Sequence, residues 1–184
     1  MTKKIEPWKT LNSELVFDHP WYKVRRDHVE LPDGQELDDY FVSVRANVVL
    51  VFALTEDEQV VLVRQYKHGF GQILVELPGG VIDEGEKAPQ EAARRELLEE
   101  TGYTSDEVEL LLEVSDNPTK DTNTISFFLA RNARLIATQQ LDPTENIEVL
   151  TVPLAQVESM ILSGQIRVAG SVALCLLALR KLKR

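Results

Sequence analysis

The stretch that decides the fold is residues 77–103, LPGGVIDEGEKAPQEAARRELLEETGY. Its Pro-Gly-Gly sequence and a second turn at residues 83–85 predict a loop, and Pro89 then suits the first turn of a helix. Gly102 predicts where that helix ends, because glycine is common just past a helix C-terminus. The stretch therefore predicts a glycine-containing loop followed by a helix over residues 89–101.

Three glutamates of this helix, Glu96, Glu99 and Glu100, lie at positions i, i+3 and i+4, which places them on one face. Like charges at this spacing repel one another by roughly 0.2–0.5 kcal/mol per pair, and the helix dipole also disfavours anions near the C-terminus. Local stability therefore does not explain the cluster. One interpretation is a solvated acidic face, and the other is a site for a hard divalent cation such as Mg²⁺ or Mn²⁺.

The surroundings of the cluster favour the cation site. Arg95 lies one turn before Glu99 and can pair with it, while Leu97 and Leu98 give the helix an apolar side on which to dock. The two glycines before the loop allow a backbone carbonyl to approach a metal without a side chain in the way.

These residues resemble a known signature. Gly80, five further residues, Glu86 and then the run Arg95-Glu96-Leu97-x-Glu99-Glu100-x-Gly102-Tyr103 resemble the Nudix box of hydrolases that cleave a nucleoside diphosphate linked to another moiety. The family pattern has seven residues between the loop glutamate and the arginine, whereas this chain has eight. The extra residue falls near 87–88, where a loop absorbs an insertion at little cost. The resemblance implies an α/β/α sandwich with a mixed sheet.

The resemblance also implies a mechanism. Glu96 and Glu100 would bind Mg²⁺ or Mn²⁺ together with the Gly79 carbonyl, Glu99 would ligate the metal or position the other groups, and Arg95 would hold the carboxylates in place. The metal would acidify a water molecule, whose hydroxide attacks one phosphorus of the diphosphate.

A later acidic segment, residues 141–154, resembles the loop from which ADP-ribose pyrophosphatases supply a glutamate as catalytic base or metal ligand. Glu145 matches that position, with Glu148 and Asp142 as alternatives. Upstream, RQYKHG at residues 64–69 resembles the RQYR-type strand of the same enzymes. Arg64 or Lys67 is a candidate to bind phosphate oxygens, and a surface ion pair is the alternative for each.

The chain before residue 45 predicts a small sheet of its own. Extended pieces at 14–17, 22–31 and 40–44 surround a turn at 32–34, so we expect an N-terminal antiparallel extension over 1–44 and a Nudix domain over 45–184. In the ADP-ribose pyrophosphatase branch a similar sheet helps form a homodimer and contributes to the substrate pocket. Trp21 is a candidate to stack on the base, and Pro118 lies about where that branch has a proline, although Asn-Pro-Thr stands here instead of Ser-Pro-Gly.

Within the second domain we expect a hairpin of strands 48–54 and 60–66, strands at 108–114 and 125–130, and helices at 154–162 and 171–182. The formal net charge of -10 and pI of about 4.8 disfavour nucleic acid and anionic membranes as partners. The single cysteine excludes an internal disulfide, and the N-terminus lacks the apolar stretch of a signal peptide. We therefore expect a cytoplasmic protein.

The favoured function is hydrolysis of ADP-ribose or a related nucleoside diphosphate sugar to a nucleoside monophosphate and a sugar phosphate. A Nudix hydrolase of dinucleoside polyphosphates or nucleoside triphosphates is one alternative, and a Nudix-fold ligand-binding module without turnover is another. The loop at residues 117–123 and the N-terminal sheet would decide between substrates. The sequence does not choose the sugar, the base or the number of metal ions.

Overall fold

The computed structural model describes residues 4–183. The chain forms two compact units. The first takes the chain as far as residue 46 and includes a later segment, residues 115–123, and the second holds the remainder.

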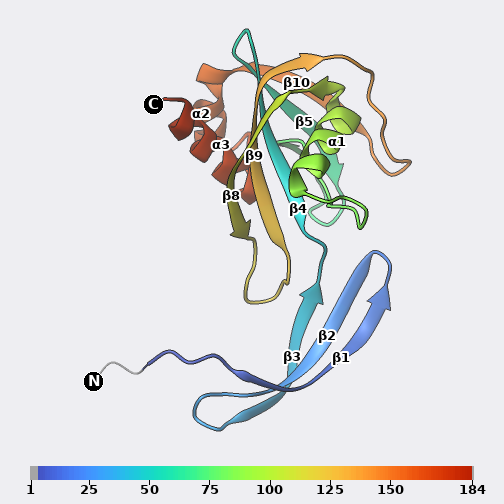
Figure 1. The fold of residues 1–184 in the computed structure, drawn as a ribbon, viewed down its shortest axis with the longest axis vertical. Coiled ribbons are helices and arrows are strands. Elements are labelled where there is room, and N and C mark those ends of the chain that lie inside the picture. Colours follow the sequence, from blue (N-terminus) through green and yellow to red (C-terminus); the bar gives the residue numbers. More distant parts are fainter. Residues whose placement is uncertain (1–3, 184) are drawn as a thin grey trace. The chain divides into compact units, whose positions relative to one another are not determined.

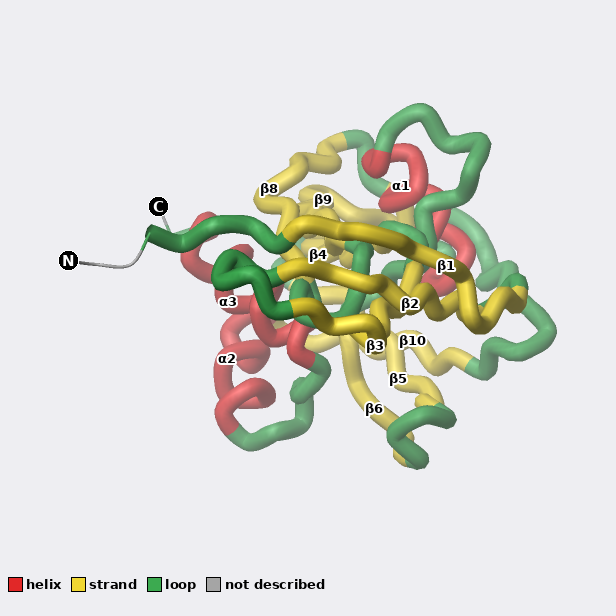
Figure 2. Tube along the Cα trace, turned by 90° about the horizontal axis from the view of Figure 1, so that it is seen from below, coloured by secondary structure: helices red, strands yellow, loops and turns green. Residues whose placement is uncertain are grey.

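The first unit is a three-stranded antiparallel sheet in the order β1-β2-β3, formed by Lys9–His19, Tyr22–Glu30 and Glu36–Val44 (Figures 1 and 2). The separate small sheet expected from the sequence is therefore confirmed, with a first strand longer than predicted. Residues 115–123 attach to β3, because Ser43 donates to the carbonyl of Lys120 and accepts from the amide of Thr122. Inside the sheet the buried Asp27 accepts hydrogen bonds from Ser13 at 2.6 Å and from Arg25 at 3.0 Å.

The second unit is built on a seven-stranded mixed sheet. Its main path is β10-β5-β4-β9-β7, while β6 pairs with β5 and β8 pairs with β9. The strands β4 and β9 are parallel, whereas β5 is antiparallel to β4, β6 and β10. The seven strands are β4 Val48–Thr55, β5 Gln59–Lys67, β6 Gln72–Glu76, β7 Tyr103–Thr104, β8 Glu107–Ser115, β9 Thr124–Leu135 and β10 Ile147–Pro153.

Helices cover both faces of this sheet (Figure 1). Helix α1, Pro89–Thr101, lies on one face, and α2, Leu154–Leu162, and α3, Ala169–Leu182, lie on the other. Alternation along β4 explains the two layers, because successive side chains of a strand point to opposite faces. Val49 and Val51 pack with α1, whereas Phe52 packs in the cluster that contains α2 and α3. The predicted α/β/α sandwich is thus confirmed.

The core on the α2 and α3 face includes the single cysteine of the chain. Cys175 is fully buried among apolar side chains, and burial raises the pKa of its thiol to about 12. No helix within residues 4–183 has the length and apolar character needed to cross a membrane.

Helices α1 and α2 have the predicted bounds, while α3 begins at Ala169, two residues earlier than expected. The early start brings Gly170 against β4, where a Cβ atom would lie 2.8 Å from Cδ1 of Leu50. Strands β6 and β7 were not predicted, because they are short and supply few alternating positions.

Candidate active site

The loop before α1 is attached to the start of β4 through its backbone. The carbonyls of Pro78 and Gly80 accept hydrogen bonds from the amides of Val51 and Val49, at 2.9 and 2.8 Å. Gly79, between them, leaves no room for a side chain, since a Cβ atom there would lie 2.1 Å from the carbonyl oxygen of Val49. The backbone of this loop can therefore approach β4 only because residue 79 is glycine.

Glu100 connects the end of α1 to this loop. Its side chain accepts a 2.8 Å hydrogen bond from the amide of Gly79, and the residue is only 3% exposed. Burial is the main cause that raises the pKa of the Glu100 carboxyl to about 8, and the negative charges of Glu96 and Glu145 act in the same direction, while the Gly79 amide and Lys67 oppose them. A buried carboxylate next to two others is a strong candidate for cation binding.

Glu96 lies beside the same loop. A Cβ atom added to Gly80 would lie 2.4 Å from a carboxylate oxygen of Glu96, so the two residues are in close contact. Burial raises the pKa of Glu96, and the charges of Glu99 and Glu145 act in the same direction, while Arg95 opposes them. Glu96 and Glu100 are therefore the two inward-facing carboxylates of the predicted triplet.

Arg95 organises the carboxylates around it. Its guanidinium donates to Glu86 at 2.9 Å, to Glu96 at 2.8 Å and to Glu99 at 3.0 Å. It also donates to the carbonyl of Val81 at 2.8 Å. These bonds lower the pKa of Glu86 and raise the pKa of Arg95 above its ordinary value. The predicted pair of Arg95 with Glu99 is present, and Glu99 faces the arginine.

The extra residue of the box leaves this network intact. The side chain of Glu86 accepts from the amide of Asp83 at 2.7 Å and still reaches Arg95. The amide of Lys87 donates to the side chain of Glu91 in the first turn of α1, at 3.0 Å. The insertion is thus absorbed between the loop and the helix, as a surface connection allows.

The residues at this site fit a divalent cation as a mixed set of donors. No group of three His, Cys, Asp or Glu side chains within residues 4–183 converges on one point, so side chains alone do not form a complete site. The carbonyl oxygen of Gly79, however, accepts none of the hydrogen bonds found in that part of the chain. Carbonyl and carboxylate oxygens are the ligands that hard cations prefer, and a cation would relieve the repulsion that raises the pKa values of Glu96 and Glu100.

Of the three candidates for the catalytic base, Asp142 donates its amide to the side chain of Glu145 at 3.0 Å, and Glu145 and Glu148 occupy different environments. The charge of Glu145 raises the pKa values of Glu96 and Glu100, so Glu145 belongs to their cluster. Glu148 lies in β10 directly opposite Arg64 of β5 and accepts from its Nε at 2.8 Å. The neighbouring pair, Val149 and Val63, shares the face on which α1 packs, so Glu148 and Arg64 lie on the other face.

The loop that carries Glu145 is held against α1 by a residue that the sequence did not single out. The side chain of Gln139 donates to the carbonyl of Glu100 at 2.6 Å and to the carbonyl of Ile147 at 3.1 Å. It therefore joins the last turn of α1 to the start of β10. The sequence gives little signal for this role, since a glutamine in a polar loop is unremarkable.

Arg64 and Lys67 are the two basic candidates on β5, and only Lys67 lies on the face of the sheet that α1 covers. Lys67 shares that face with Val61, and its charge lowers the pKa of Glu100. Its Nζ lies 2.7 Å from the side chain of Glu76, which no sequence motif indicated. A phosphate contact by Arg64 or by Lys67 stays a prediction.

Two predicted substrate residues belong to the first unit. Trp21 lies in the turn between β1 and β2 and is 85% exposed. Pro118 lies in the 115–123 segment, next to Thr119, whose carbonyl accepts a 2.7 Å hydrogen bond from Tyr40. Their contacts with substrate stay predictions.

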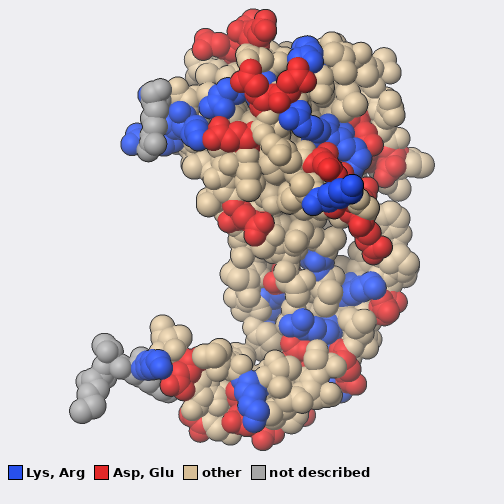
Figure 3. Space-filling view, viewed as in Figure 1, with Lys and Arg blue, Asp and Glu red and all other residues tan. Residues whose placement is uncertain are grey.

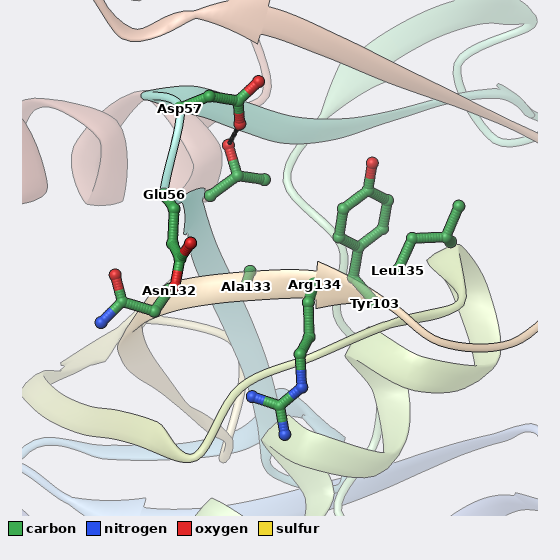
Figure 4. A pocket seen from close by; sticks show the side chains of 8 residues that line it. Glu56, Asp57, Tyr103, Asn132, Ala133, Arg134 and Leu135 are labelled. Atoms are coloured by element: carbon green, nitrogen blue, oxygen red, sulfur yellow. Dashed lines mark hydrogen bonds between the residues drawn. The ribbon is translucent and has the colours of Figure 1, made fainter.

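Two hollows of the second unit differ in their lining. One, of about 380 Å³, is bounded by the turn after β4 and by residues of β7 and β9, among them Tyr103 and Asn132 (Figure 4). The other, of about 450 Å³, contains Arg64 and Glu148. Neither includes a carboxylate of the box, so neither is the candidate active site.

Charges of both signs are mixed on the surface that Figure 3 shows. On the face drawn in Figure 3, Lys and Arg side chains are interspersed with Asp and Glu and do not form a continuous basic patch. A broad basic surface is the feature that nucleic-acid binding requires.

Comparisons with known proteins agree with this site. A family model described as NUDIX domain matches residues 44–169, and one described as nucleoside diphosphate sugar hydrolase N-terminal domain matches residues 8–43. The chain is 31% identical over 147 residues to a methanol dehydrogenase activator of Bacillus methanolicus, covering 79% of this chain and 78% of that protein. It is 28% identical over 159 residues to an ADP-ribose pyrophosphatase of Bacillus subtilis (strain 168), covering 86% and 85%.

The fold also has a close structural counterpart. A crystal structure of an ADP compounds hydrolase superposes with a TM-score of 0.87 at 24% identity, over 99% of this chain and 97% of that one. At this identity the likeness concerns the fold. With the NUDIX model covering most of the second unit and the box residues assembled around Arg95, the chain belongs to the Nudix family of hydrolases.

Proposed function

We propose that this Nudix hydrolase cleaves the diphosphate bond of ADP-ribose or a related nucleoside diphosphate sugar. The observation that carries the proposal is the assembled box, in which Arg95 donates to Glu86, Glu96 and Glu99 and the buried Glu100 accepts from the amide of Gly79. The match of residues 8–43 to the N-terminal domain of nucleoside diphosphate sugar hydrolases supports the substrate class. The products would be a nucleoside monophosphate and a sugar phosphate.

Nudix hydrolases generally use divalent metals, and we assign Mg²⁺ or Mn²⁺ to this one. Glu96, Glu100 and the carbonyl of Gly79 would hold the ion, with Glu99 kept in place through Arg95. When bound, such an ion neutralises charge on the diphosphate and makes a water molecule more acidic.

The remaining steps are assigned to side chains. Glu145 accepts a proton from the water whose oxygen attacks one phosphorus, and the bond from that phosphorus to the bridging oxygen breaks. The bridging oxygen leaves with the other phosphate. Lys67 donates to a phosphate oxygen from the α1 face of the sheet, and its influence on the pKa of Glu100 supports its proximity to the cluster.

We also propose that the protein is a homodimer formed through the N-terminal sheet. Several large apolar side chains of this sheet are about half exposed in the single chain, namely Leu15, Val16, Phe17, Tyr22 and Phe41. Exposed apolar groups of this kind favour association. Trp21 would stack on the base, and Pro118 would shape the loop that meets the substrate.

The test is release of nucleoside monophosphate from a panel containing ADP-ribose, other nucleoside diphosphate sugars, dinucleoside polyphosphates and nucleoside triphosphates. Each substrate is assayed with Mg²⁺, with Mn²⁺ and with chelator. Metal-dependent turnover that is fastest on a nucleoside diphosphate sugar is the expected result. Fastest turnover of a triphosphate or a dinucleoside polyphosphate would show that the proposed substrate class is wrong. Binding without turnover would indicate a ligand-binding module.

A further inference from the structure

Glu76 is a buried carboxylate in the last position of β6, an edge strand that pairs with β5. The residue is 6% exposed. Its side chain lies 2.7 Å from Nζ of Lys67 and accepts a 3.0 Å hydrogen bond from the side-chain amide of Gln65. One carboxylate therefore holds two side chains of the neighbouring strand.

The strand register places this group on the face of the sheet that α1 covers. Glu76 pairs with Val63, and residues directly opposite one another in a ladder point to the same face. Gln65 and Lys67 follow Val63 at intervals of two residues, so their side chains point to the same face. Val61 also points to this face, and it packs in the core cluster that contains residues of α1. The ammonium of Lys67 consequently lies on the side where α1 presents Glu96 and Glu100.

Stability alone does not account for a buried carboxylate at residue 76. The side chain of Glu76 is removed from water, whereas that of Lys67 is 40% exposed, and a well-packed apolar side chain in place of a buried charge is often neutral or stabilising. A lysine at the end of a strand would otherwise have a long, mobile side chain. The carboxylate of Glu76 restricts that freedom and leaves donors of the ammonium for another acceptor, because an ammonium has three N–H groups.

We propose that Glu76 is a positioning residue, which holds the ammonium of Lys67 and the amide of Gln65 toward the carboxylates of α1 so that they meet the diphosphate of the substrate. The role rests on the proposed function. Glu76 does not contact the substrate, and it acts through Lys67. Its contribution should therefore disappear when Lys67 is absent.

The experiment is a double-mutant cycle of E76Q, K67M and E76Q/K67M on the full chain. Binding of ADP-ribose with a methylene group in place of the bridging oxygen is measured by calorimetry with Mg²⁺, and kcat/KM is measured on ADP-ribose. We expect E76Q and K67M each to weaken binding about tenfold, and the double variant to bind no more weakly than K67M. The matched control is E158Q, which removes an exposed carboxylate 3.9 Å from Lys183.

The cycle separates the two proposals. Wild-type protein that neither binds the analogue nor cleaves ADP-ribose overturns the proposed function. Wild-type protein that does both, with E76Q at wild-type affinity or with independent losses from the two substitutions, overturns the positioning role alone. If K67M does not fold because Glu76 is left unpaired, E76Q is compared with E76Q/K67M. Equal affinities support the role, and a further tenfold loss in the double variant overturns it.

Discussion

The amide of Gly79 donates a 2.8 Å hydrogen bond to the side chain of Glu100, which is 21 residues further along the chain. This bond fixes the loop against the last turn of α1. It also brings the backbone of Gly79 to the carboxylate that is most strongly affected by burial. A backbone donor of the loop and a buried carboxylate of the helix thus meet where the two segments join.

Replacing Glu100 with glutamine should weaken cation binding and turnover together. The amide keeps the shape of the side chain but removes one of the charges that would hold the ion. We expect E100Q to lower kcat/KM by a factor of about 100 or more, as for loss of a first ligand to a catalytic metal. Titration with Mn²⁺ by electron paramagnetic resonance reports affinity independently of activity. Tight binding that is indifferent to the substitution would remove Glu100 from the ligand set.

Metal-free protein should lose stability as the pH rises. The pKa of Glu100 is raised by burial from 4.5 to about 8, and that of Glu96 is raised for the same reason. Between pH 4.5 and about 8 the folded chain keeps a proton that the unfolded chain releases, so the free energy of unfolding falls across this window.

Thermal unfolding in chelator tests this sign. The melting temperature of E100Q should lie above that of wild type at pH 8.5 and close to it at pH 5. In a domain of this size, each kcal/mol of difference in the free energy of unfolding shifts the melting temperature by about 2–4 °C. Added Mg²⁺ should raise the melting temperature of wild type more than that of E100Q at pH 8.5. A wild-type protein that is stabilised relative to E100Q as the pH rises in chelator contradicts the assignment.

Arg95 should not tolerate lysine. The guanidinium donates to Glu86 from Nε and to both Glu96 and Glu99 from Nη1, whereas an ammonium is a single point of charge. We expect R95K to reduce kcat/KM by about 10- to 100-fold and to lower the melting temperature. A matched control is R134K, which changes an exposed arginine that pairs with Asp106. Equal behaviour of the two variants would show that the network around Arg95 has no special role.

The two glutamates near β10 should differ in their effect on the chemical step. Glu145 belongs to the carboxylate cluster, whereas Glu148 pairs with Arg64 on the other face of the sheet. If Glu145 is the general base, E145Q should lower kcat by about 10²- to 10⁴-fold, while E148Q stays within a few-fold of wild type. Single-turnover kinetics with saturating Mg²⁺ makes the comparison. A larger loss in E148Q would transfer the role to Glu148.

Alanine should be harmful at Gly79 and harmless at Gly85, although both glycines lie in the same loop. A Cβ atom at Gly79 would collide with the carbonyl of Val49 at 2.1 Å, and the backbone there has a φ of +157°. A Cβ atom at Gly85 would meet nothing within 4 Å. We expect G79A to lose about 2 kcal/mol or more of folding free energy and most of its activity, measured by urea unfolding and turnover. Similar values for G79A and G85A would contradict this account.

Much of the fold could be read from local signals. Pro89 and Gly102 mark the ends of α1, and in the structure Gly102 adopts a φ of 74° while its amide bonds to Leu98. The layered architecture followed from the strands and the box. The sequence also placed three glutamates on one helix face, but it could not show that Glu99 stays partly exposed while Glu96 and Glu100 are largely buried. That division depends on contacts with a loop distant in sequence.

The face of β5 shows a further limit of sequence analysis. Alternation separates Arg64 from Lys67, so the two cannot point to the same side of the sheet. Helices cover both faces of the sheet, however, so the residues of β5 before Arg64 are apolar on both faces. The sequence therefore does not tell which face α1 covers. Only the packing of Val61 against α1 identifies the face of Lys67. The sequence could not indicate the proposed role of Glu76 for a related reason. Strand β6 is short, and its register with β5 is set by the tertiary structure.

The buried cysteine makes this protein convenient for labelling. With a thiol pKa of about 12 and no exposed surface, Cys175 should stay unreactive toward maleimides in the folded state at neutral pH. A new cysteine at an exposed position of the N-terminal sheet, such as Leu15, would then be the one reactive thiol of the chain. Spin or fluorescent labels introduced there would test the proposed dimer, without first removing the native cysteine.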